Sequence, residues 1–556
     1  MEPTKARNHA NAGQLVGQQL IDLKNLRALS SSAIMAANAG QKYLALDLIG
    51  QALKLGPNTP GVMFNAALVF NRYGHTQRAR QLWERLAVLQ PGSMEPLWNL
   101  AIHHATRDDA ETAEKYFRKV MELAPRKPGL HLNLGNMLKN SGRIEEAIAV
   151  YREGARLFPQ EICQSSNYLL ALHYDPAHGP EQIHAEHTAW GLALEATVPA
   201  AIGHGNDRSP DRRLRNLLPL FRQHDHAQFE IYCYSDTPHP DDLTALFRQR
   251  ADVWCDTAGL SDAELAAQVS QDRIDVLVDL VMHTEGARPG MFARKPAPIQ
   301  VAWMAYPGST GLSRMDYRFT DPVLDPPGET DHFYTEQSIR LETFWCFDPP
   351  AGSPAVGPSP LDKNGYVTFG CLNGFVKVND ATLELWREIL TAVPDSRLIF
   401  LPPNGKITGR VREKLGVAPA RLIGLPRQSR LEYLKYYHRI DLALDPFPYT
   451  GHSTTLDGLW MGVPLVTLAG PTVVSRGSLS ILSNLGLTEL AVKNKTDYVS
   501  LTVALAKDHG RLRELRNGLR GRLERSVLMD ANRFARQTES AYRTIWHTWC
   551  KTAHAS

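Results

Sequence analysis

The chain has 556 residues, a formal net charge of +3 and 21% charged residues. This length exceeds what a single hydrophobic core normally supports, so we expect two to four domains. The small net charge argues against a nucleic-acid partner, because such partners are bound by a concentrated basic face.

Cysteine usage and hydropathy indicate the compartment. The 6 cysteines are scattered without a Cys-x-x-Cys pair, which predicts free thiols in a reducing compartment, with no disulfide framework or zinc site. The N-terminal sequence lacks the apolar core of a signal peptide, and no apolar run reaches the roughly 18 residues of a membrane span. We therefore expect a cytoplasmic protein with no membrane partner.

The first third of the chain follows a 34-residue period. Small, bulky and proline positions recur in fixed phase: Ala45, Ala79, Ala113 and Ala147; Ile49, Trp83, Phe117 and Tyr151; Pro57, Pro91, Pro125 and Pro159. Turn positions follow at Gly40, Gly74 and Gly142, with Asp108 in the third repeat. The pattern is typical of tetratricopeptide helix pairs, in which alanine allows close helix approach and proline ends the second helix. It predicts repeats over about 26–161 within an all-α domain over 1–200.

An asparagine recurs on the first helix of each pair, at Asn65, Asn99, Asn133 and Asn167. A carboxamide offers two donors and an acceptor, so a ladder of these side chains in the groove of the solenoid suits the backbone of an extended acceptor polypeptide. The alternative is that each asparagine bonds within its own repeat or caps a neighbouring turn.

The pattern changes beyond a polar, glycine-containing segment at 199–210. Short apolar strands expected at 229–234, 274–280 and 299–304 alternate with helices, which predicts a parallel sheet covered by helices over 201–350. A proline-rich connector at 349–360 precedes a second α/β unit over 351–556. Its expected elements include strands at 366–369, 397–401, 442–444 and 464–468 and a helix at 382–390. Two such units predict a cleft at the carboxyl ends of the strands, where nucleotides bind in open parallel sheets.

The segment at 450–460 carries the clearest chemistry. It follows an expected strand and opens a helix, where Gly451 permits a sharp entry and Ser453 or Thr454 can cap the first turn. Free amides and the positive end of the helix dipole would bind phosphate there, and Asp457, one turn further on, can accept hydrogen bonds from a ribose diol. An ordinary capped helix would explain the serine and threonine equally well.

Several motifs resemble those of O-linked N-acetylglucosamine transferases, and the chain looks like a bacterial homologue of them. They are the segment Gly451–Asp457 with Trp460, Gly462 and Pro464; the segment Arg294–Gln300, continuing through Trp303 to Tyr306–Gly311; and Met315–Tyr317 with Asp321. The resemblance covers nearly the whole chain. It implies a tetratricopeptide superhelix followed by a two-lobed GT-B catalytic region with Rossmann-like lobes.

The resemblance also implies site residues. Lys377 matches the lysine that holds the diphosphate of UDP, and His452, Ser453 and Thr454 match the helix start beside it. Asp457 matches the ribose ligand, while Arg430 and Tyr433 match positions that flank the uracil. In the first lobe, Gly308 and Thr310 match the turn that lines the sugar pocket, and His283 faces the cleft as a catalytic or a structural residue.

The implied reaction transfers N-acetylglucosamine from UDP-GlcNAc to Ser or Thr hydroxyls of polypeptides, with inversion. We expect no metal and no cofactor, since Lys377 and the helix N-terminus can replace a divalent cation. The residues assign no general base, and a phosphate oxygen of the donor is one candidate. Two rivals stay open: a GT-B transferase acting on a glycan or lipid acceptor, and a repeat scaffold with weak or inactive catalytic lobes.

One departure from the family pattern concerns the start of the first lobe. Family members begin this lobe with a strand of the type Arg-Ile-Gly-Tyr-Val-Ser and a loop that carries a histidine. In this sequence, residues 214–215 are followed directly by 216–220, so the strand and its loop are absent. His224 and His226 are expected in a surface loop. Either the chain has lost a catalytic element or the recorded sequence skips residues. We expect the second, because losing a central strand would expose the core of the sheet.

The second explanation predicts a larger protein. Mass spectrometry of the purified protein should give a mass above 62.0 kDa. A measured mass equal to 62.0 kDa would reject this explanation and leave the loss of a catalytic element.

Overall fold

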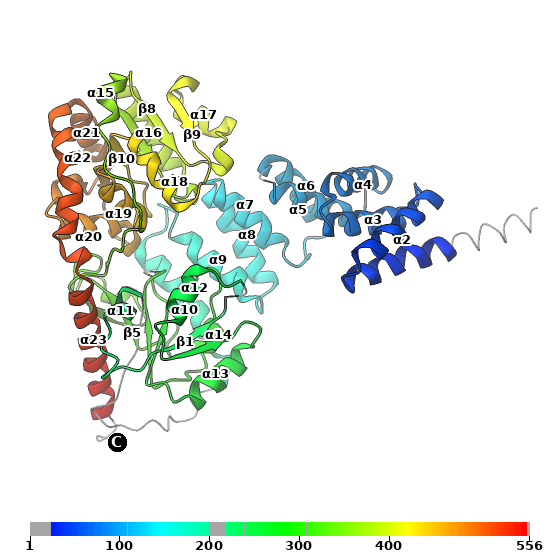
Figure 1. Cartoon of the computed structure of the whole chain (residues 1–556), viewed down its shortest axis with the longest axis horizontal. Coiled ribbons are helices and arrows are strands. Elements are labelled where there is room, and N and C mark those ends of the chain that lie inside the picture. The colour runs from blue at the N-terminus through cyan, green and yellow to red at the C-terminus, as the bar shows by residue number, and fades with distance from the viewer. Residues whose placement is uncertain (1–23, 108, 200–217, 238, 307, 553–556) are drawn as a thin grey trace, which may run out of the picture. The chain divides into compact units, whose positions relative to one another are not determined.

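A computed structural model describes residues 24–107, 109–199, 218–237, 239–306 and 308–552 (Figure 1). The chain divides into two compact units, Met1–Met137 and Leu138–Ser556. Each unit is described by itself. The position Asp108, assigned to a turn above, lies outside the described residues.

The first unit is built of antiparallel helix pairs. After a helix at 24–38, it contains α2 (Lys42–Leu55), α3 (Pro60–Arg72), α4 (Thr76–Leu89), α5 (Met94–Ala105), α6 (Ala110–Leu123) and the start of α7 (Leu130–Asn140). Gly40 and Gly74 have φ values of 74° and 84°, so glycine supplies the left-handed turn between paired helices.

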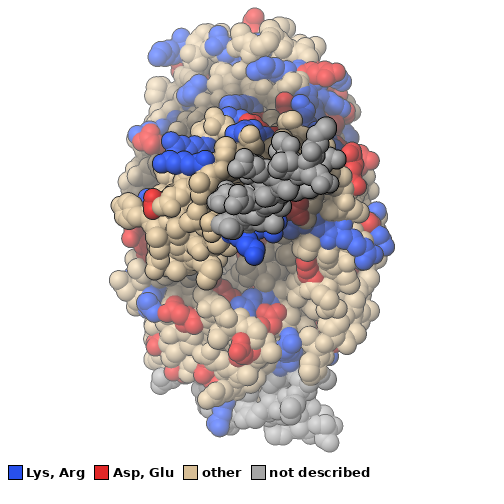
Figure 2. All heavy atoms as spheres, turned by 90° about the vertical axis from the view of Figure 1, so that its right-hand side faces the viewer, with Lys and Arg blue, Asp and Glu red and all other residues tan. Residues whose placement is uncertain are grey.

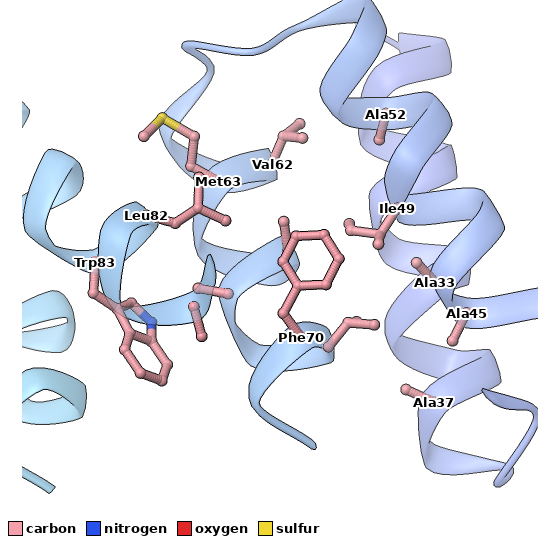
Figure 3. Packing of buried hydrophobic residues seen from close by; sticks show 14 of the residues in the cluster. Ala33, Ala37, Ala45, Ile49, Ala52, Val62, Met63, Phe70, Leu82 and Trp83 are labelled. Carbon is pink, nitrogen blue, oxygen red and sulfur yellow. The ribbon is translucent and has the colours of Figure 1, made fainter. Parts of the chain in front are cut away.

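The periodic alanines and bulky residues form the core of this unit. Ala45, Ala79 and Ala113 are each 0% exposed, and Ile49, Trp83 and Phe117 are buried beside them. Figure 3 shows Phe70 of α3 lying among Ile49 and the small residues of the neighbouring helices. The sequence period is therefore confirmed as helix-pair packing, in which the small alanine on one helix leaves room for a large side chain from the next helix.

In the second unit, two helices continue the 34-residue repeat and a third helix follows them. They are α8 (Ile144–Leu157), α9 (Ile162–Leu172) and α10 (Pro180–Glu195). Ala147 and Tyr151 of α8 are 0% exposed, as the period predicts. Helix α10 lies outside the 34-residue phase and packs beside α9 and the first α/β lobe.

The first α/β lobe contains two separate parallel sheets. Its elements are α11 (Leu218–Gln223), β1 (Tyr232–Ser235), α12 (Asp242–Arg248), β2 (Val253–Asp256), α13 (Asp262–Gln271), β3 (Val276–Asp279), α14 (Pro289–Phe292), β4 (Ile299–Ala302), β5 (Tyr317–Thr320) and β6 (Gln337–Arg340). Strands β1 and β2 pair with each other, and the other sheet has the order β3-β4-β5-β6.

The second lobe has a single six-stranded parallel sheet with the order β12-β11-β10-β7-β8-β9. Its strands are β7 (Thr368–Cys371), β8 (Arg397–Phe400), β9 (Leu422–Gly424), β10 (Leu442–Leu444), β11 (Leu465–Leu468) and β12 (Ala491–Val492). Its helices are α15 (Pro360–Asn364), α16 (Asp380–Ala392), α17 (Gly409–Leu415), α18 (Arg430–Lys435), α19 (Ser453–Trp460), α20 (Gly477–Asn484), α21 (Lys495–Lys507) and α22 (His509–Glu524). All four residues of β7 and of β11 are buried, because helices cover both faces.

The last helix, α23 (Ala531–Thr552), returns to the first lobe and lies beside α11 (Figure 1). Glu539 accepts a hydrogen bond from Asp225 N (3.2 Å) and lies 2.9 Å from Nδ1 of His224. His224 is 6% exposed, so its expected place in a surface loop is wrong. The sequence could not show that His224 is buried, because its partner Glu539 in α23 lies 315 residues later in the chain.

The two sheets of the first lobe are separate. This concerns the strand at the start of the lobe that the family pattern has and this sequence lacks. In the described part of the chain, β1 pairs with β2 alone and β3 with β4 alone. A cavity of about 600 Å³ lies between them, lined by β1, β3 and apolar side chains such as Phe221, Leu265 and Phe292. Among the described residues, this cavity lies beside two unpaired sheet edges, whereas native interiors are usually close-packed.

The fold class expected from the sequence is confirmed: an all-α repeat region precedes two α/β lobes with parallel sheets. The strand at 442–444 and the helix at 382–390 were predicted at or within their observed bounds. Strands β2, β5, β6, β9 and β12 were not predicted: β2, β5 and β6 carry polar side chains, and β9 and β12 are only two or three residues long. The domain limits at 200 and 350 stay predictions.

Candidate active site

The order of strands in the second lobe places a crevice between β7 and β10. These two strands are neighbours in the sheet, with Leu442 opposite Phe369 and Ala443 opposite Gly370. From β7 the sheet continues through β8 and β9 to one side, and from β10 through β11 and β12 to the other. Such a reversal of direction opens a binding crevice at the carboxyl ends of the two strands. A small cavity at this point is lined by Asn373, Asp445 and Thr454 among others.

Lys377 follows β7 at the end of a short 3₁₀ helix, η2 (Phe375–Lys377). Its Nζ donates a hydrogen bond to the carbonyl oxygen of Thr450 (2.6 Å) and lies 4.2 Å from the ring centroid of Tyr449. Burial lowers the pKa of Lys377 to about 8, although the nearby carboxylate of Asp445 acts in the opposite direction. The crevice therefore holds a lysine whose pKa lies well below the usual range of this side chain.

Asp445, at the end of β10, shapes the loop that enters α19. One carboxylate oxygen accepts from the amide of Gly451 (2.7 Å), and the other accepts from the hydroxyl of Thr467 (2.6 Å). Burial raises the pKa of this carboxyl. A Cβ at Gly451 would lie 2.3 Å from Thr455 Oγ1, so only glycine fits there. Sequence reasoning found the glycine and missed the aspartate that fixes it.

Helix α19 begins at Ser453, and its N-cap residue is His452, whose side chain makes no capping hydrogen bond. The expectation that Ser453 or Thr454 caps this helix is therefore wrong. His452 lies between the rings of Trp345 and Tyr449, with centroids 5.0 and 5.1 Å away, and burial holds its pKa well below the usual range. Its Nε2 is buried without a hydrogen-bond partner among the described residues. The first amides of α19 also point out of the helix, as they do at any helix start.

Asp457 and Arg430 were expected to contact ribose and uracil, and the structure pairs them with each other. The Arg430 guanidinium donates to one oxygen of Asp457 at 2.6 Å and to the other at 2.5 Å. Asp457 is buried, whereas Arg430 is half-exposed. Tyr433 lies beside the pair, with the Arg430 guanidinium 5.6 Å from its ring and its hydroxyl 3.0 Å from that of Tyr437.

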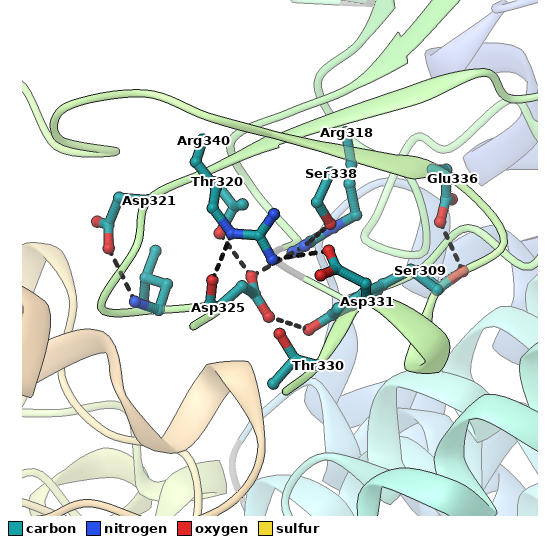
Figure 4. Close-up of polar contacts among 12 residues, drawn as sticks. Ser309, Arg318, Thr320, Asp321, Asp325, Thr330, Asp331, Glu336, Ser338 and Arg340 are labelled. Carbon is teal, nitrogen blue, oxygen red and sulfur yellow. Dashed lines mark hydrogen bonds and ion pairs between the residues drawn. The ribbon is translucent and has the colours of Figure 1, made fainter. Parts of the chain in front are cut away.

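In the first lobe, Gly308 and Thr310 belong to a buried turn that Glu336 holds. Glu336 accepts from the Thr310 amide (2.6 Å) and from the Ser309 hydroxyl (2.8 Å), as Figure 4 shows for Ser309. The hydroxyl of Thr310 also donates to Glu336. Sequence reasoning missed this buried glutamate, since nothing near position 336 shows that β6 lies beside the turn.

His283 is fully enclosed and joins this turn to the last repeat helices. Its Nε2 lies 3.0 Å from the carbonyl oxygen of Thr310, and its Nδ1 lies 3.3 Å from the hydroxyl of Ser166 in α9. Burial lowers its pKa to about 3, with His187 as a further cause. These contacts are those of a residue that orients the turn.

Aromatic stacking connects the repeat end to the crevice. Tyr174, just after α9, stacks on Tyr449 with ring centroids 4.9 Å apart and an interplanar angle of 19°. Asn379 donates to the carbonyl oxygens of Tyr174 (3.0 Å) and Phe447 (2.7 Å). The Tyr449 ring beside Lys377 is therefore held by the end of the repeat region and by the second lobe together.

The periodic asparagines bond inside the solenoid. Nδ2 donates to the carbonyl oxygen four residues earlier in three of them, with distances of 2.9 Å in Asn99, 2.8 Å in Asn133 and 2.9 Å in Asn167. Asn65 donates instead to the hydroxyl of Ser30 (2.7 Å). For Asn99, Asn133 and Asn167 this is the within-repeat bonding that the sequence left open as the alternative, whereas Asn65 bonds to a helix of the preceding pair. It uses one of the two amide hydrogens and fixes the orientation of each side chain.

Several other expectations can be set against the described residues. All six cysteines are free thiols, as predicted. Basic and acidic side chains are interspersed over the face seen in Figure 2. Among the described residues no three His, Cys, Asp or Glu side chains are placed to bind one metal ion. Over the same residues, every helix is too short or too polar to span a bilayer.

Fold and crevice together define a class: a tetratricopeptide-repeat protein that carries a two-lobed nucleotide-sugar transferase fold. The model of glycosyl transferase family 41 matches residues 207–349 and 361–538, and a tetratricopeptide-repeat model matches 128–161. The chain belongs to glycosyl transferase family 41.

Similar proteins agree with this assignment. The structure of a mutant O-GlcNAc transferase from Thermobaculum terrenum superposes with a TM-score of 0.77 at 31% identity, covering 96% of this chain and 99% of that one. Two plant relatives are probable UDP-N-acetylglucosamine–peptide N-acetylglucosaminyltransferases named SPINDLY. The protein of Oryza sativa subsp. japonica is 33% identical over 72% of this chain and 46% of its own length. The protein of Arabidopsis thaliana is 36% identical over 66% of this chain and 42% of its own length. The chain thus spans less than half the length of these plant relatives.

Proposed function

We propose that the chain transfers N-acetylglucosamine from UDP-GlcNAc to serine or threonine hydroxyls of polypeptides, with inversion at the anomeric carbon. The observation that carries the proposal is the convergence of Lys377, the buried Nε2 of His452 and the first amides of α19 at the crevice between β7 and β10. The names of the plant relatives and of the Thermobaculum enzyme support the donor and the acceptor class.

In this proposal the diphosphate of the donor binds between Lys377 and the start of α19. As the glycosidic bond breaks, negative charge develops on the leaving diphosphate, and the ammonium and helix amides stabilise it without a metal ion. Lys377 exchanges its bond to the Thr450 carbonyl for a phosphate oxygen. A charge-assisted contact of this kind contributes about 1.5–3 kcal/mol to binding.

The nucleoside occupies the region of Asp457, Arg430 and Tyr433 in this proposal. The ion pair between Asp457 and Arg430 opens, so that the carboxylate accepts from the ribose diol while the guanidinium reaches the base. Tyr433 then offers its ring to the uracil. Gly308 and Thr310 line the sugar, with His283 and Glu336 as the residues that orient their turn.

Calorimetry with UDP tests the donor site. We expect binding of equal strength with and without Mg²⁺ at pH 7, and affinity that falls as the pH rises above about 8. The sign follows from the lowered pKa of Lys377: the ammonium is present below pH 8, and above it the anion binds only with uptake of a proton. Absence of binding under all of these conditions would contradict the proposal.

The acceptor side is tested separately by replacing the periodic asparagines, Asn65, Asn99, Asn133 and Asn167, with alanine. A polypeptide acceptor bound by these amides should lose transfer at subsaturating concentration, while UDP binding stays unchanged. A glycan acceptor should be insensitive to the replacement. Unfolding curves control for the loss of the bonds to Ser30 and to the helix carbonyls.

A second candidate is a repeat scaffold with weak catalysis, and one observation favours it. Among the described residues, no strand joins β1 to β3, and a cavity of about 600 Å³ lies beside them. Hydrolysis of radiolabelled UDP-GlcNAc in the absence of acceptor separates the two candidates. An active enzyme releases sugar at a measurable rate, whereas a scaffold binds the nucleotide without turnover.

A further inference from the structure

A small cavity lies where α9 and α10, the helices that cap the repeats, meet both α/β lobes. His173, at the end of α9, and His184 of α10 line it on one side, and Gly308 and Ser309 of the first lobe on another. Thr472 closes it from the segment after β11 in the second lobe. Its volume is about 20 Å³, which exceeds the roughly 10–15 Å³ that one water molecule needs.

Three side chains that line this cavity, from three parts of the chain, have buried polar atoms without a hydrogen-bond partner among the described residues. Both ring nitrogens of His173, Nδ1 of His184 and Oγ1 of Thr472 make no hydrogen bond with any described residue. His173 is 3% exposed and Thr472 is 8% exposed. Buried polar atoms in native proteins nearly always have a partner, so several of them at one cavity indicate a bound group.

The other polar groups of the lining are already engaged. The Ser309 hydroxyl donates to Glu336 (2.8 Å), and the Tyr334 hydroxyl donates to Asp325 (2.5 Å). His187 is bonded at both nitrogens, to the Ile183 carbonyl at 2.7 Å and to the Tyr306 hydroxyl at 2.6 Å. No Lys, Arg, Asp or Glu side chain is among the residues described as lining the cavity. The bound group is therefore neutral and has both donor and acceptor capacity.

We propose that the cavity binds one ordered water molecule, which joins His173 and His184 of the repeat-capping helices to Thr472 of the second lobe. A neutral imidazole has one donor and one acceptor nitrogen, and water can satisfy either. A hydroxyl group at Thr472 completes the set of partners that a buried water needs. The cavity volume of about 20 Å³ limits the space to one molecule, and a Cβ added at Gly308 would lie 2.9 Å from His173 Nε2.

This water adds a contact between the repeat end and the second lobe, next to the stacking of Tyr174 on Tyr449 and the bond from Asn379 to the Tyr174 carbonyl. It lies beside the turn of Gly308 and one residue away from Tyr174, which stacks on the ring beneath Lys377. The inference does not depend on the donor or the acceptor. It concerns how the second lobe is held against α9 and α10.

A crystal structure of the unmodified protein at about 1.5 Å resolution tests the site directly. We expect a density peak within hydrogen-bond distance, about 2.7–3.2 Å, of polar atoms from at least two of His173, His184 and Thr472. A dry cavity, or a peak that contacts none of them, would overturn the proposal.

A double-mutant cycle measures the connection in solution. Phe fits the shape of His173, whose ring packs edge-to-face against His187 and Tyr306, and Val fits that of Thr472. We expect His173→Phe and Thr472→Val each to lower the melting temperature, and the double variant to lower it by less than the sum. Thr472→Ser, which keeps the hydroxyl, should retain the melting temperature to within about 1 °C. Additive shifts, or a higher melting temperature for Thr472→Val, would overturn the proposal.

Discussion

Replacing Lys377 with Met is expected to reduce turnover of UDP-GlcNAc by a factor of about 10²–10³, the usual loss when one charge-stabilising group is removed from a transition state. The methionine keeps the length of the side chain and its contact with the Tyr449 ring, but it has no charge to offer the leaving diphosphate. Binding of UDP should weaken by about tenfold or more, since a charge-assisted hydrogen bond is lost. Steady-state kinetics and calorimetry on the same preparation give both numbers.

Lys435 provides a matched control for this substitution. It is exposed, pairs with Glu432 three residues away, and lies in α18 outside the crevice between β7 and β10. Lys435→Met should therefore leave turnover and UDP affinity unchanged. Unaltered turnover of Lys377→Met would remove the residue from the mechanism and with it the main support for the proposed function.

The second large effect is expected from Asp325→Ala in the first lobe. Asp325 is 0% exposed and accepts from the Arg318 guanidinium (2.9 Å) and the Thr320 hydroxyl (2.5 Å), as Figure 4 shows. Arg318 is itself 2% exposed and lies over the ring of Tyr334. Alanine would leave a buried guanidinium without its counter-ion, at a cost of about 3–5 kcal/mol in the free energy of unfolding. Urea unfolding monitored by tryptophan fluorescence measures it.

Asp331→Ala is the corresponding control, since its carboxylate pairs with Arg340 in the same region (Figure 4). That side chain is half-exposed, so its loss should cost below about 1 kcal/mol. Replacing Arg318 and Asp325 together, by Met and Leu, removes both charges and should recover most of the stability. Equal losses for Asp325→Ala and Asp331→Ala would show that burial of the pair has no energetic consequence.

The repeat region could be read from the sequence in detail because its contacts are local. Each alanine and its bulky counterpart lie within one or two repeats of each other, so a fixed period already specifies which helices touch. Ala79 and Trp83 are buried where the period places them. The role of the asparagines was less predictable, because a carboxamide can bond to its own helix or to a ligand with the same side chain.

The second lobe was predictable in its buried strands and less so in its site. A run such as 465–468 is mostly apolar and buried on both faces, and it indicates a parallel strand by itself. The phosphate segment at 451–457 was found because its chemistry is contiguous in sequence. The pairing of Arg430 with Asp457, 27 residues apart, depends on how α18 and α19 pack, which a local pattern does not contain.

The lysine that follows β7 was identified through the resemblance to the transferase family. By itself the sequence determined the repeat period, the alternation of strands and helices and the glycine that enters α19. These follow from the spacing of side chains along one segment, which fixes local structure. Tertiary structure alone decided that Asp445 holds the loop, that Glu336 holds the turn and that His283 is enclosed. Each of these depends on groups brought together by packing of distant elements, and the free energy of burying a charge or leaving an edge unpaired is set by that packing.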